Sequence, residues 1–221
     1  MKDFLKQLIF PNKCILCRTI LNDQTVGHLC DACYSLVLRH DVCHKWGMPY
    51  QASENDCVYA LFPYNNQYRK AVLRWKYRGI RKYAKIYANL LVNDLCFLNQ
   101  INIDALVPVP LSASRQRKRG FNQALDLANE ISKLTDIPVY DILKRSRNTK
   151  PQSKCSKKER LQNLKGSMSL KDKAFKEISS IALVDDIYTT GATIRECIRA
   201  IQEKQSSSKL TIYVIVVCIG V

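Results

Sequence analysis

The sequence predicts an α/β protein in which a doubly wound, mostly parallel sheet follows a small cysteine-rich head. From Val58 onward, short apolar segments of strand length alternate with segments whose apolar residues recur at helical spacing. That alternation is typical of parallel sheets with helices on both faces. Before Val58, two Cys-x-x-Cys pairs lie in a stretch too short and too polar to fold around a core of its own. We therefore expect a head at residues 1–57 and a larger domain at residues 58–221.

Each element of the larger domain is predicted from its residue pattern. Strand-like runs occur at residues 58–64, 104–110, 166–169, 181–184 and 210–219, with a strand or strand entry at 139–143. Apolar residues at intervals of three and four predict helices at residues 68–77, 82–95, 122–134 and 194–202. Prolines stop pairing at the end of the second strand. Residues 149–163 are polar and lack periodicity, which predicts a long loop.

The two cysteine pairs predict a structural zinc site. Each Cys-x-x-Cys turn can present two thiolates on one side of a tight loop, and two facing turns form a closed tetrahedral site with no position for water. Metal binding would then be coupled to folding of the head. A redox dithiol and unliganded cysteines are the alternatives. The predicted ligands are Cys14, Cys17, Cys30 and Cys33. His28, His40 and His44 are interpreted as surface residues, because four thiolates satisfy the metal.

The chain has ten cysteines but no visible targeting segment. Its first ten residues lack a sustained apolar stretch, and the apolar tail at residues 211–221 is about half as long as a membrane span. Without a secretory signal, thiol or metal chemistry is favoured over a disulfide scaffold. We therefore expect a cytoplasmic protein with no membrane span. Cys57, Cys197 and Cys218 lie in apolar surroundings and are predicted to be core thiols.

The net charge of +16 is concentrated in two segments. Residues 69–119 contain twelve lysines and arginines against two aspartates, and residues 144–176 contain twelve against one aspartate and one glutamate. Such segregation favours a surface that binds a polyanion. A solvated lysine-rich surface without a partner is the alternative.

Residues 181–193 have the composition of a site for a phosphorylated sugar. An apolar run predicts a short buried strand, and the hydroxyl-rich turn after it presents side chains and backbone N–H groups at a helix N-terminus, which suits a phosphate. The two aspartates repel a phosphate but can accept hydrogen bonds from ribose hydroxyls. Gly191 allows the backbone to approach the phosphate closely. A strand followed by an ordinary capping turn is the alternative. The candidate binding residues are Asp185, Asp186, Thr189, Thr190, Gly191, Ala192 and Thr193.

This segment resembles the loop of type I phosphoribosyltransferases that binds phosphoribosyl pyrophosphate (PRPP). In those enzymes the acidic pair binds the ribose hydroxyls and the Thr-Thr-Gly-x-Thr turn binds the 5′-phosphate, and every signature position is present here. The resemblance implies a type I phosphoribosyltransferase-like fold and Mg²⁺ bound with PRPP. It also implies a transfer chemistry in which electrostatic placement matters more than a general base. The motif does not separate PRPP binding from PRPP turnover.

A basic segment follows the strand that the prolines terminate. Arginines beside the N-terminus of a helix near Asn122 suit a pyrophosphate or a nucleic-acid backbone. The candidate residues are Arg115, Arg117, Lys118 and Arg119. Aromatic residues also alternate with lysine and arginine earlier in the chain, where they could stack on the bases of single-stranded DNA. These aromatics are Tyr68, Trp75, Tyr77, Tyr83 and Tyr87. The alternative, above all for Trp75, is a place in the core.

The order of motifs resembles the ComF family of bacterial competence proteins over nearly the whole chain. The motifs are the cysteine head, Trp75-Lys-Tyr-Arg-Gly79, Val-Pro-Val-Pro with Arg-Gly-Phe-Asn-Gln, Lys-Pro-Gln with Glu-Arg-x-x-Asn, and the PRPP-type loop. The resemblance implies a role in natural transformation after DNA uptake, with single-stranded DNA and a competence helicase as partners. Many relatives carry a second cysteine pair beginning near Cys43. Trp46 stands where the second member would be, which argues against a second metal site.

Three functions are compatible with these features. The first is a PRPP-binding, DNA-associated competence factor. The second is a phosphoribosyltransferase that moves the phosphoribosyl group to an unidentified base or other nucleophile, with the zinc head shaping or replacing the acceptor pocket. The third is a structural nucleic-acid adaptor whose loop no longer binds a ligand, which the completeness of the loop argues against.

Overall fold

The computed structural model describes residues 11–22, 28–39, 44–47, 57–94, 101–146, 164, 166–171, 178–203 and 210–220. Its main sheet has five strands in the order β1-β2-β7-β6-β3. These strands are β1 (His44–Gly47), β2 (Cys57–Pro63), β3 (Ala105–Pro108), β6 (Ser180–Tyr188) and β7 (Thr211–Ile219). Every neighbouring pair is parallel except β1 and β2, which are antiparallel. The predicted mostly parallel α/β sheet is confirmed.

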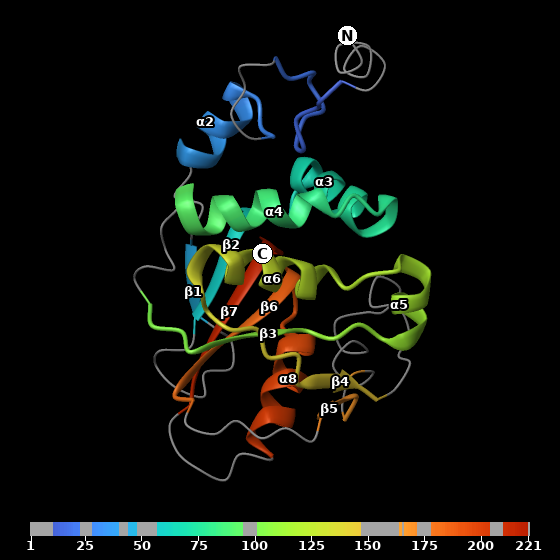
Figure 1. The fold of residues 1–221 in the computed structure, drawn as a ribbon, viewed down its shortest axis with the longest axis vertical. Coiled ribbons are helices and arrows are strands. Elements are labelled where there is room, and N and C mark those ends of the chain that lie inside the picture. Colours follow the sequence, from blue (N-terminus) through green and yellow to red (C-terminus); the bar gives the residue numbers. More distant parts are fainter. Residues whose placement is uncertain are drawn as a thin grey trace.

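Helices cover both faces of the sheet, because side chains of successive strand residues point to opposite faces. Ala182 and Val184 of β6 belong to a first core, which they share with α3 (Asn66–Arg78), α4 (Lys82–Asn89) and α6 (Gln123–Thr135). Ile181 and Leu183 of the same strand belong to a second core, which they share with α8 (Ala192–Gln202). Figure 1 shows α8 on the opposite side of the sheet from α3, α4 and α6. The sheet is therefore doubly wound.

Side-chain caps and left-handed residues fix where the helices begin and end. The Asn65 side chain accepts from the Tyr68 N–H at the start of α3, and the Asn122 side chain accepts from the Ala124 N–H at the start of α6. Gly79, at φ 62°, ends α3. After α4, the chain continues in a π-helical turn at Leu90–Asp94.

The structure differs from the sequence prediction in several elements. Strand β6 continues four residues beyond Val184, because its last residues, Ile187 and Tyr188, pair with β7. A short helix, α5 (Ala113–Arg119), forms in the basic segment, for which no helix was predicted. A two-stranded antiparallel ribbon, β4 (Leu143–Arg145) and β5 (Met168–Leu170), lies apart from the main sheet. Within the predicted strand at 139–143, Val139 forms only an isolated bridge with Leu106.

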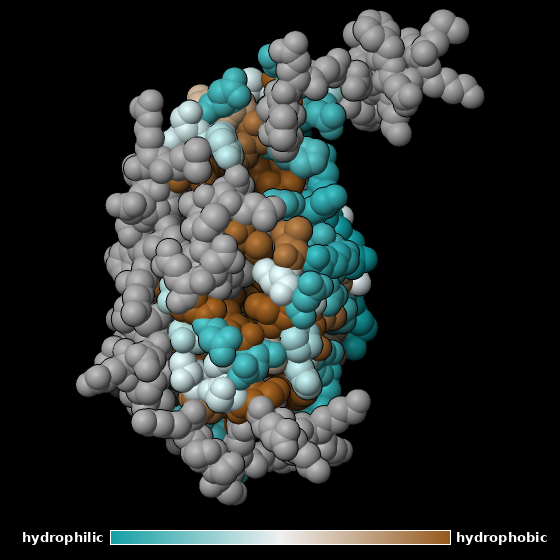
Figure 2. Space-filling model, turned by 60° about the vertical axis from the view of Figure 1, so that its left-hand side comes forward, coloured by the Kyte–Doolittle hydropathy of each residue, from teal (hydrophilic) through white to brown (hydrophobic). Residues whose placement is uncertain are grey.

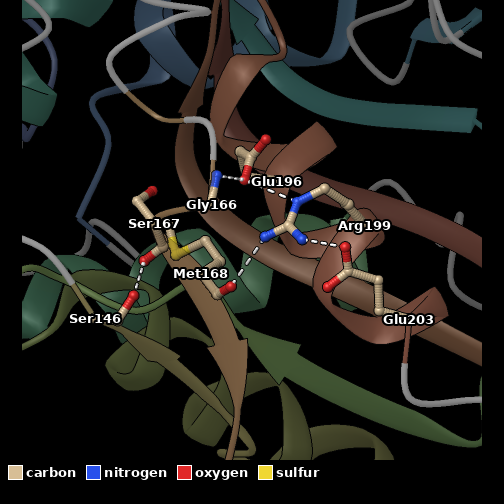
Figure 3. A network of polar contacts seen from close by, with 7 residues as sticks. All are labelled: Ser146, Gly166, Ser167, Met168, Glu196, Arg199 and Glu203. Carbon is tan, nitrogen blue, oxygen red and sulfur yellow. Dashed lines mark hydrogen bonds and ion pairs between the residues drawn. The ribbon is translucent and has the colours of Figure 1, made fainter.

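A polar network attaches the ribbon to α8 (Figure 3). Arg199 donates to the Met168 carbonyl at 3.2 Å and pairs with Glu196 and Glu203, and Glu196 accepts from the Gly166 N–H at 2.7 Å. The ribbon also contributes Leu143, Met168 and Leu170 to the second core. These contacts give β4 a fixed place beside the carboxyl end of β6.

The cysteine-rich head lies over α3 and α4 (Figure 1), and it includes α2 (Asp31–Arg39). Its apolar residues Ile15, Leu16 and Val37 join Val72 and Trp75 of α3 in one continuous core. The division into domains at residues 57 and 58 stays a prediction. When the left-hand side of Figure 1 is turned forward, apolar residues are visible in the middle of the described surface, and hydrophilic residues line its right-hand margin (Figure 2).

Among the described residues, Cys197 and Cys218 are buried core thiols, as predicted. The apolar tail forms β7 rather than a helix. None of the described helices combines the length and the apolar character that crossing a membrane requires.

Candidate functional site

A cavity of about 580 Å³ opens at the carboxyl ends of β3 and β6. Ligands of doubly wound sheets bind at this edge, where strand order changes direction. The lining residues come from α3, the β3–α5 connection, α5, β4, β6 and the start of α8. The charged and hydroxyl side chains among them are Tyr64, Arg69, Lys76, Tyr77, Arg115, Arg119, Arg145, Asp185, Asp186, Thr189 and Thr193.

The two aspartates lie within β6. The sequence had predicted that this strand ends at residue 184, before both of them. Asp186 is buried, at 8% exposed, and its carboxylate is 2.7 Å from Lys76 Nζ. One oxygen of Asp185 accepts from the Asp186 N–H at 2.7 Å. Burial and the negative charge of Asp186 raise the pKa of Asp185 to about 7, although Lys76 and Arg145 oppose that shift. The pair therefore presents two acceptors of different character to the cavity.

The turn after β6 places only part of the predicted hydroxyl set in the cavity. Thr189 and Thr193 line it, whereas Thr190, Gly191 and Ala192 do not. The Thr190 carbonyl accepts from Arg195 at 2.8 Å, which holds the turn against α8. Because α8 begins at Ala192, the N–H groups of its first turn lack partners within the helix. Thr193 belongs to this turn and lines the cavity. This is the arrangement expected of a phosphate-binding turn.

Gly191 is required for a reason that the sequence did not reveal. Its φ is 68°, and a Cβ atom at this position would lie 2.5 Å from the hydroxyl of Tyr188. Tyr188 is itself buried in the second core, so its ring has little freedom to move aside. The turn is therefore shaped by packing on Tyr188 as well as by any approach to a phosphate.

We expect Gly191→Ala to destabilise the protein more than Gly120→Ala. Both glycines have positive φ, but nothing lies within 4 Å of a Cβ at Gly120. The backbone penalty is about 1–2 kcal/mol at either site, and the clash with Tyr188 adds about 1–3 kcal/mol only at Gly191. Urea denaturation of the two variants measures the difference. Equal losses of unfolding free energy would show that Tyr188 does not restrict this turn.

The basic segment divides into two pairs. Arg115 and Arg119 line the cavity, whereas Arg117 and Lys118 are exposed on the rest of α5. Burial and the charge of Arg119 lower the pKa of Arg115, which is the signature of cations held close together out of water. Only one half of the predicted set is thus placed to meet a ligand in the cavity.

Residues of α3 and β4 also enter the cavity. The sequence analysis assigned no role to Lys76 or Arg145, and it named Tyr77 only as a candidate for stacking on DNA bases. Lys76 and Tyr77 belong to the Trp75–Gly79 motif, and Arg145 belongs to β4. Burial and the nearby Arg115 lower the pKa of Arg145 to about 10. The motif was a usable signal for α3, whereas nothing in the local sequence marks Arg145.

Four of the five aromatic residues proposed for stacking lie in the core, which was the alternative given for them, above all for Trp75. In the core, Tyr68 is 4% exposed, and Trp75, Tyr83 and Tyr87 are 0–1% exposed. Tyr77 alone is exposed, at 59%, and Arg119 lies 5.1 Å from the centre of its ring. One aromatic side chain therefore remains available for stacking at the mouth of the cavity.

The four predicted zinc ligands meet in the head. Their sulfur atoms all lie within 4.8 Å of one another. Thiolates bound tetrahedrally to zinc at 2.3 Å would be about 3.8 Å apart, so the cluster fits the ion with little adjustment. Burial opposes ionisation of Cys17, but hydrogen bonding to Thr19 outweighs it and lowers the pKa of this thiol to about 6. A thiolate is the form that binds zinc.

The first cysteine turn is fixed to α3 by Arg74. Its guanidinium donates to the carbonyls of Ile15 and Leu16, at 2.6 and 3.1 Å, and to the hydroxyl of Tyr83 at 3.2 Å. Lys76, two residues later on the same helix, lines the cavity and pairs with Asp186. Helix α3 therefore connects the zinc site with the acidic pair.

The interpretation of the histidines as surface residues is wrong for His28. Its side chain is half-buried, and its Nδ1 has no hydrogen-bond partner among the described residues. Burial lowers the pKa of His28, and the charges of Lys82 and Lys85 lower it further. The side chains of His40, His44, Cys43, Trp46 and Cys57 lie outside the part of the chain described, as does the loop at 149–163.

These features define the class of protein. It is an α/β domain with an acidic pair and a hydroxyl-rich turn at the end of β6, beside a cavity, and with a four-cysteine head. The family model for the double zinc ribbon domain matches residues 5–61. Together with the four-sulfur cluster, that match supports structural zinc in the head.

Curated proteins match most of the chain. It is 32% identical to Competence protein F of Haemophilus influenzae, over 85% of this chain and 89% of that protein. It is 31% identical to Competence protein ComFC of Bacillus subtilis, over 92% and 83% respectively, and 26% identical to the DNA utilization protein YhgH of Escherichia coli, over 86% and 90%. The chain therefore belongs to the ComF family of competence proteins, as the order of its motifs predicts.

A solved structure, the purine phosphoribosyltransferase from Pyrococcus horikoshii, aligns with 64% of this chain and 83% of its own. The TM-score is 0.32 and the sequence identity is 15%.

Proposed function

We propose that this protein binds PRPP in the cavity and single-stranded DNA on the basic surface beside it, and that it acts in natural transformation. One observation carries the PRPP assignment. Two aspartates, two threonines and two arginines that the sequence marked in separate segments line the same cavity. The carboxylates suit the ribose hydroxyls, the threonines with the start of α8 suit the 5′-phosphate, and the arginines suit the pyrophosphate. The names of the relatives, Competence protein F and Competence protein ComFC, support the role in competence.

Isothermal titration calorimetry with PRPP tests this function. We expect saturable binding of one PRPP per chain, with ribose 5-phosphate binding more weakly because it lacks the group that meets Arg115 and Arg119. Arg115→Gln should reduce that preference for PRPP, since Arg115 lines the cavity and Arg117 does not. Arg117→Gln is the matched control from the same helix. Absence of PRPP binding to the intact protein would remove the assignment.

Transfer of the phosphoribosyl group is the alternative function. The cavity reaches the solvent-exposed Tyr77, which leaves an acceptor a route to bound PRPP. Release of pyrophosphate on addition of a nucleobase or DNA would establish turnover. Its absence, with PRPP binding intact, leaves a binding function.

For single-stranded DNA, we expect the double variant Arg117→Glu with Lys118→Glu to lose affinity while PRPP binding is retained. Both side chains are exposed on α5, outside the lining of the cavity but next to Arg115 and Arg119. Each lost phosphate contact should also reduce the salt dependence by about 0.7 in a double-logarithmic plot. Fluorescence anisotropy at several salt concentrations measures both quantities.

The control is a second double variant, Lys82→Glu with Lys85→Glu, which makes the same change of charge on α4. These lysines line a different groove, together with Asp126 and Glu130. If the two double variants weaken DNA binding equally, the DNA is attracted by net charge and is not held at α5. A competence helicase, as a further partner, is proposed from the family resemblance alone.

Mg²⁺ was predicted together with PRPP, but the acidic pair does not fit a directly bound metal. The Lys76 ammonium lies 2.7 Å from Asp186, where such an ion would bind. Burial and the charge of Asp186 also raise the pKa of Asp185, so ionising both carboxyls to hold a hard cation costs free energy. No step of the proposed binding passes through a metal.

A further inference from the structure

The acidic pair already has a cation of its own. Lys76 reaches Asp186 from α3, and both side chains are 12% exposed, so the ion pair is largely out of water. The neighbouring Trp75 is fully buried and Arg74 is bonded to the head, so the helix that carries Lys76 is fixed on two sides. A lysine on a rigid helix is held in place before any ligand arrives.

The rest of the cavity is also cationic. Among its described lining residues, Arg69, Arg115, Arg119 and Arg145 accompany Lys76, against two carboxylates. The pKa of Arg145 is lowered by burial and by Arg115, and the pKa of Arg115 is lowered by burial and by Arg119. Positive charges that are held close together repel one another. An anion that binds between them relieves this repulsion, so the cluster binds an anion more strongly than the same cations would if they were far apart.

In a site with few cations, a divalent ion is needed to offset the charge of a pyrophosphate. We propose that in this protein Lys76, with the arginines around it, takes the place of that ion, so that the cavity binds PRPP without a divalent metal. The inference rests on the proposed PRPP-binding function. It assigns Lys76 two contacts: with Asp186 in the empty cavity, and with the bound ligand between the ribose and the pyrophosphate.

The test is calorimetry with PRPP in EDTA and in excess MgCl₂, for the intact protein and for Lys76→Gln. We expect the dissociation constant of the intact protein to change by less than about threefold between the two conditions. Lys76→Gln should bind PRPP at least tenfold more weakly in EDTA, with recovery in MgCl₂ because the ion can then reach Asp186 (about 1.4 kcal/mol for tenfold). Lys76→Arg, which keeps the charge, should stay independent of metal.

The outcomes separate this inference from the function on which it rests. Binding of PRPP to the intact protein in MgCl₂ but not in EDTA overturns the inference and leaves the PRPP assignment standing. Absence of binding in both conditions overturns both. Because loss of Lys76 leaves Asp186 without its partner, circular dichroism is used to check that Lys76→Gln is folded. If it is not, metal independence is decided on the intact protein and on Lys76→Arg.

Discussion

Replacing Cys14 with serine is expected to abolish stoichiometric zinc binding and to lower the stability of the whole chain, not of the head alone. Cys14 is fully buried, and it belongs to the core that continues through Val72 and Trp75 of α3. Zinc contributes about 10–16 kcal/mol in small metal-folded domains, more than the net stability of many whole proteins, so the head should not stay ordered without it. Trp75 would then lose part of its cover.

Native mass spectrometry counts the zinc, and thermal unfolding followed by circular dichroism measures the stability. Cys197→Ser is the matched control, because Cys197 is equally buried but lies in the second core with α8. It should keep one zinc per chain. A Cys14→Ser protein that retains one zinc and an unchanged melting temperature would contradict the assignment of this ligand.

The same variant should weaken PRPP binding, although Cys14 lies outside the cavity. Arg74 bonds the first cysteine turn, and Lys76, two residues later on the same helix, bonds Asp186. If the head loses its order, α3 loses the contacts that fix its outer side. The effect on PRPP should be smaller than that of changing Asp186 itself.

The candidate phosphosugar loop could be recognised in the sequence because its signal is local. An apolar run, two acids and a hydroxyl-rich turn with one glycine occupy thirteen consecutive residues, 181–193. The end of β6 was not predictable in the same way. The strand extends to Tyr188 because Ile187 and Tyr188 pair with Cys218 and Ile219 of β7, some thirty residues away. The β-propensity of Ile187 alone does not indicate that this residue pairs with β7.

Helix α5 was missed because it has no apolar face. The segment Ala113–Arg119 contains no buried residue, so the periodicity that marks a core-facing helix is absent. Its end is set by Gly120 in the left-handed conformation, whose N–H donates to the Gln116 carbonyl. A glycine after a basic run was the one available signal.

The aromatic residues show the opposite error, in which a pattern suggested a surface and the fold made a core. Trp75, Tyr83 and Tyr87 pack edge to face, with ring centres 5.3 and 6.0 Å apart for the pairs that share Tyr87. These helices are covered by the sheet on one side and by the cysteine-rich head on the other. They therefore bury a larger part of their surface than the apolar pattern of a single helix predicts. The arginines between them reach the solvent or the head because their stems are long.

Substitution of either aspartate by asparagine is expected to weaken PRPP binding, but the two substitutions should change the stability of the protein in opposite directions. Asp185→Asn removes a charge that burial and Asp186 make unfavourable, so the empty protein should become more stable at about pH 8. Asp186→Asn instead leaves the Lys76 ammonium without its ion-pair partner at 12% exposure, which should cost about 3–5 kcal/mol. Either change removes an acceptor for the ribose hydroxyls, and we expect PRPP affinity to fall about 10- to 100-fold.

The pH dependence separates the gain at Asp185 from a general effect on packing. The pKa of Asp185 is about 7 in the folded protein, against 3.8 for an aspartate exposed to water, so between these limits the folded state binds more protons than the unfolded state. Stability conferred by the neutral carboxyl is therefore present at low pH and is lost as the pH rises toward 7. The advantage of Asp185→Asn should be absent below about pH 4, grow as the pH rises from about 4 to about 7, and stay at its full value above that. Urea denaturation of the variant and the unchanged protein across this range measures it. An advantage that is constant with pH would mean that the Asp185 carboxylate is not the source of the strain.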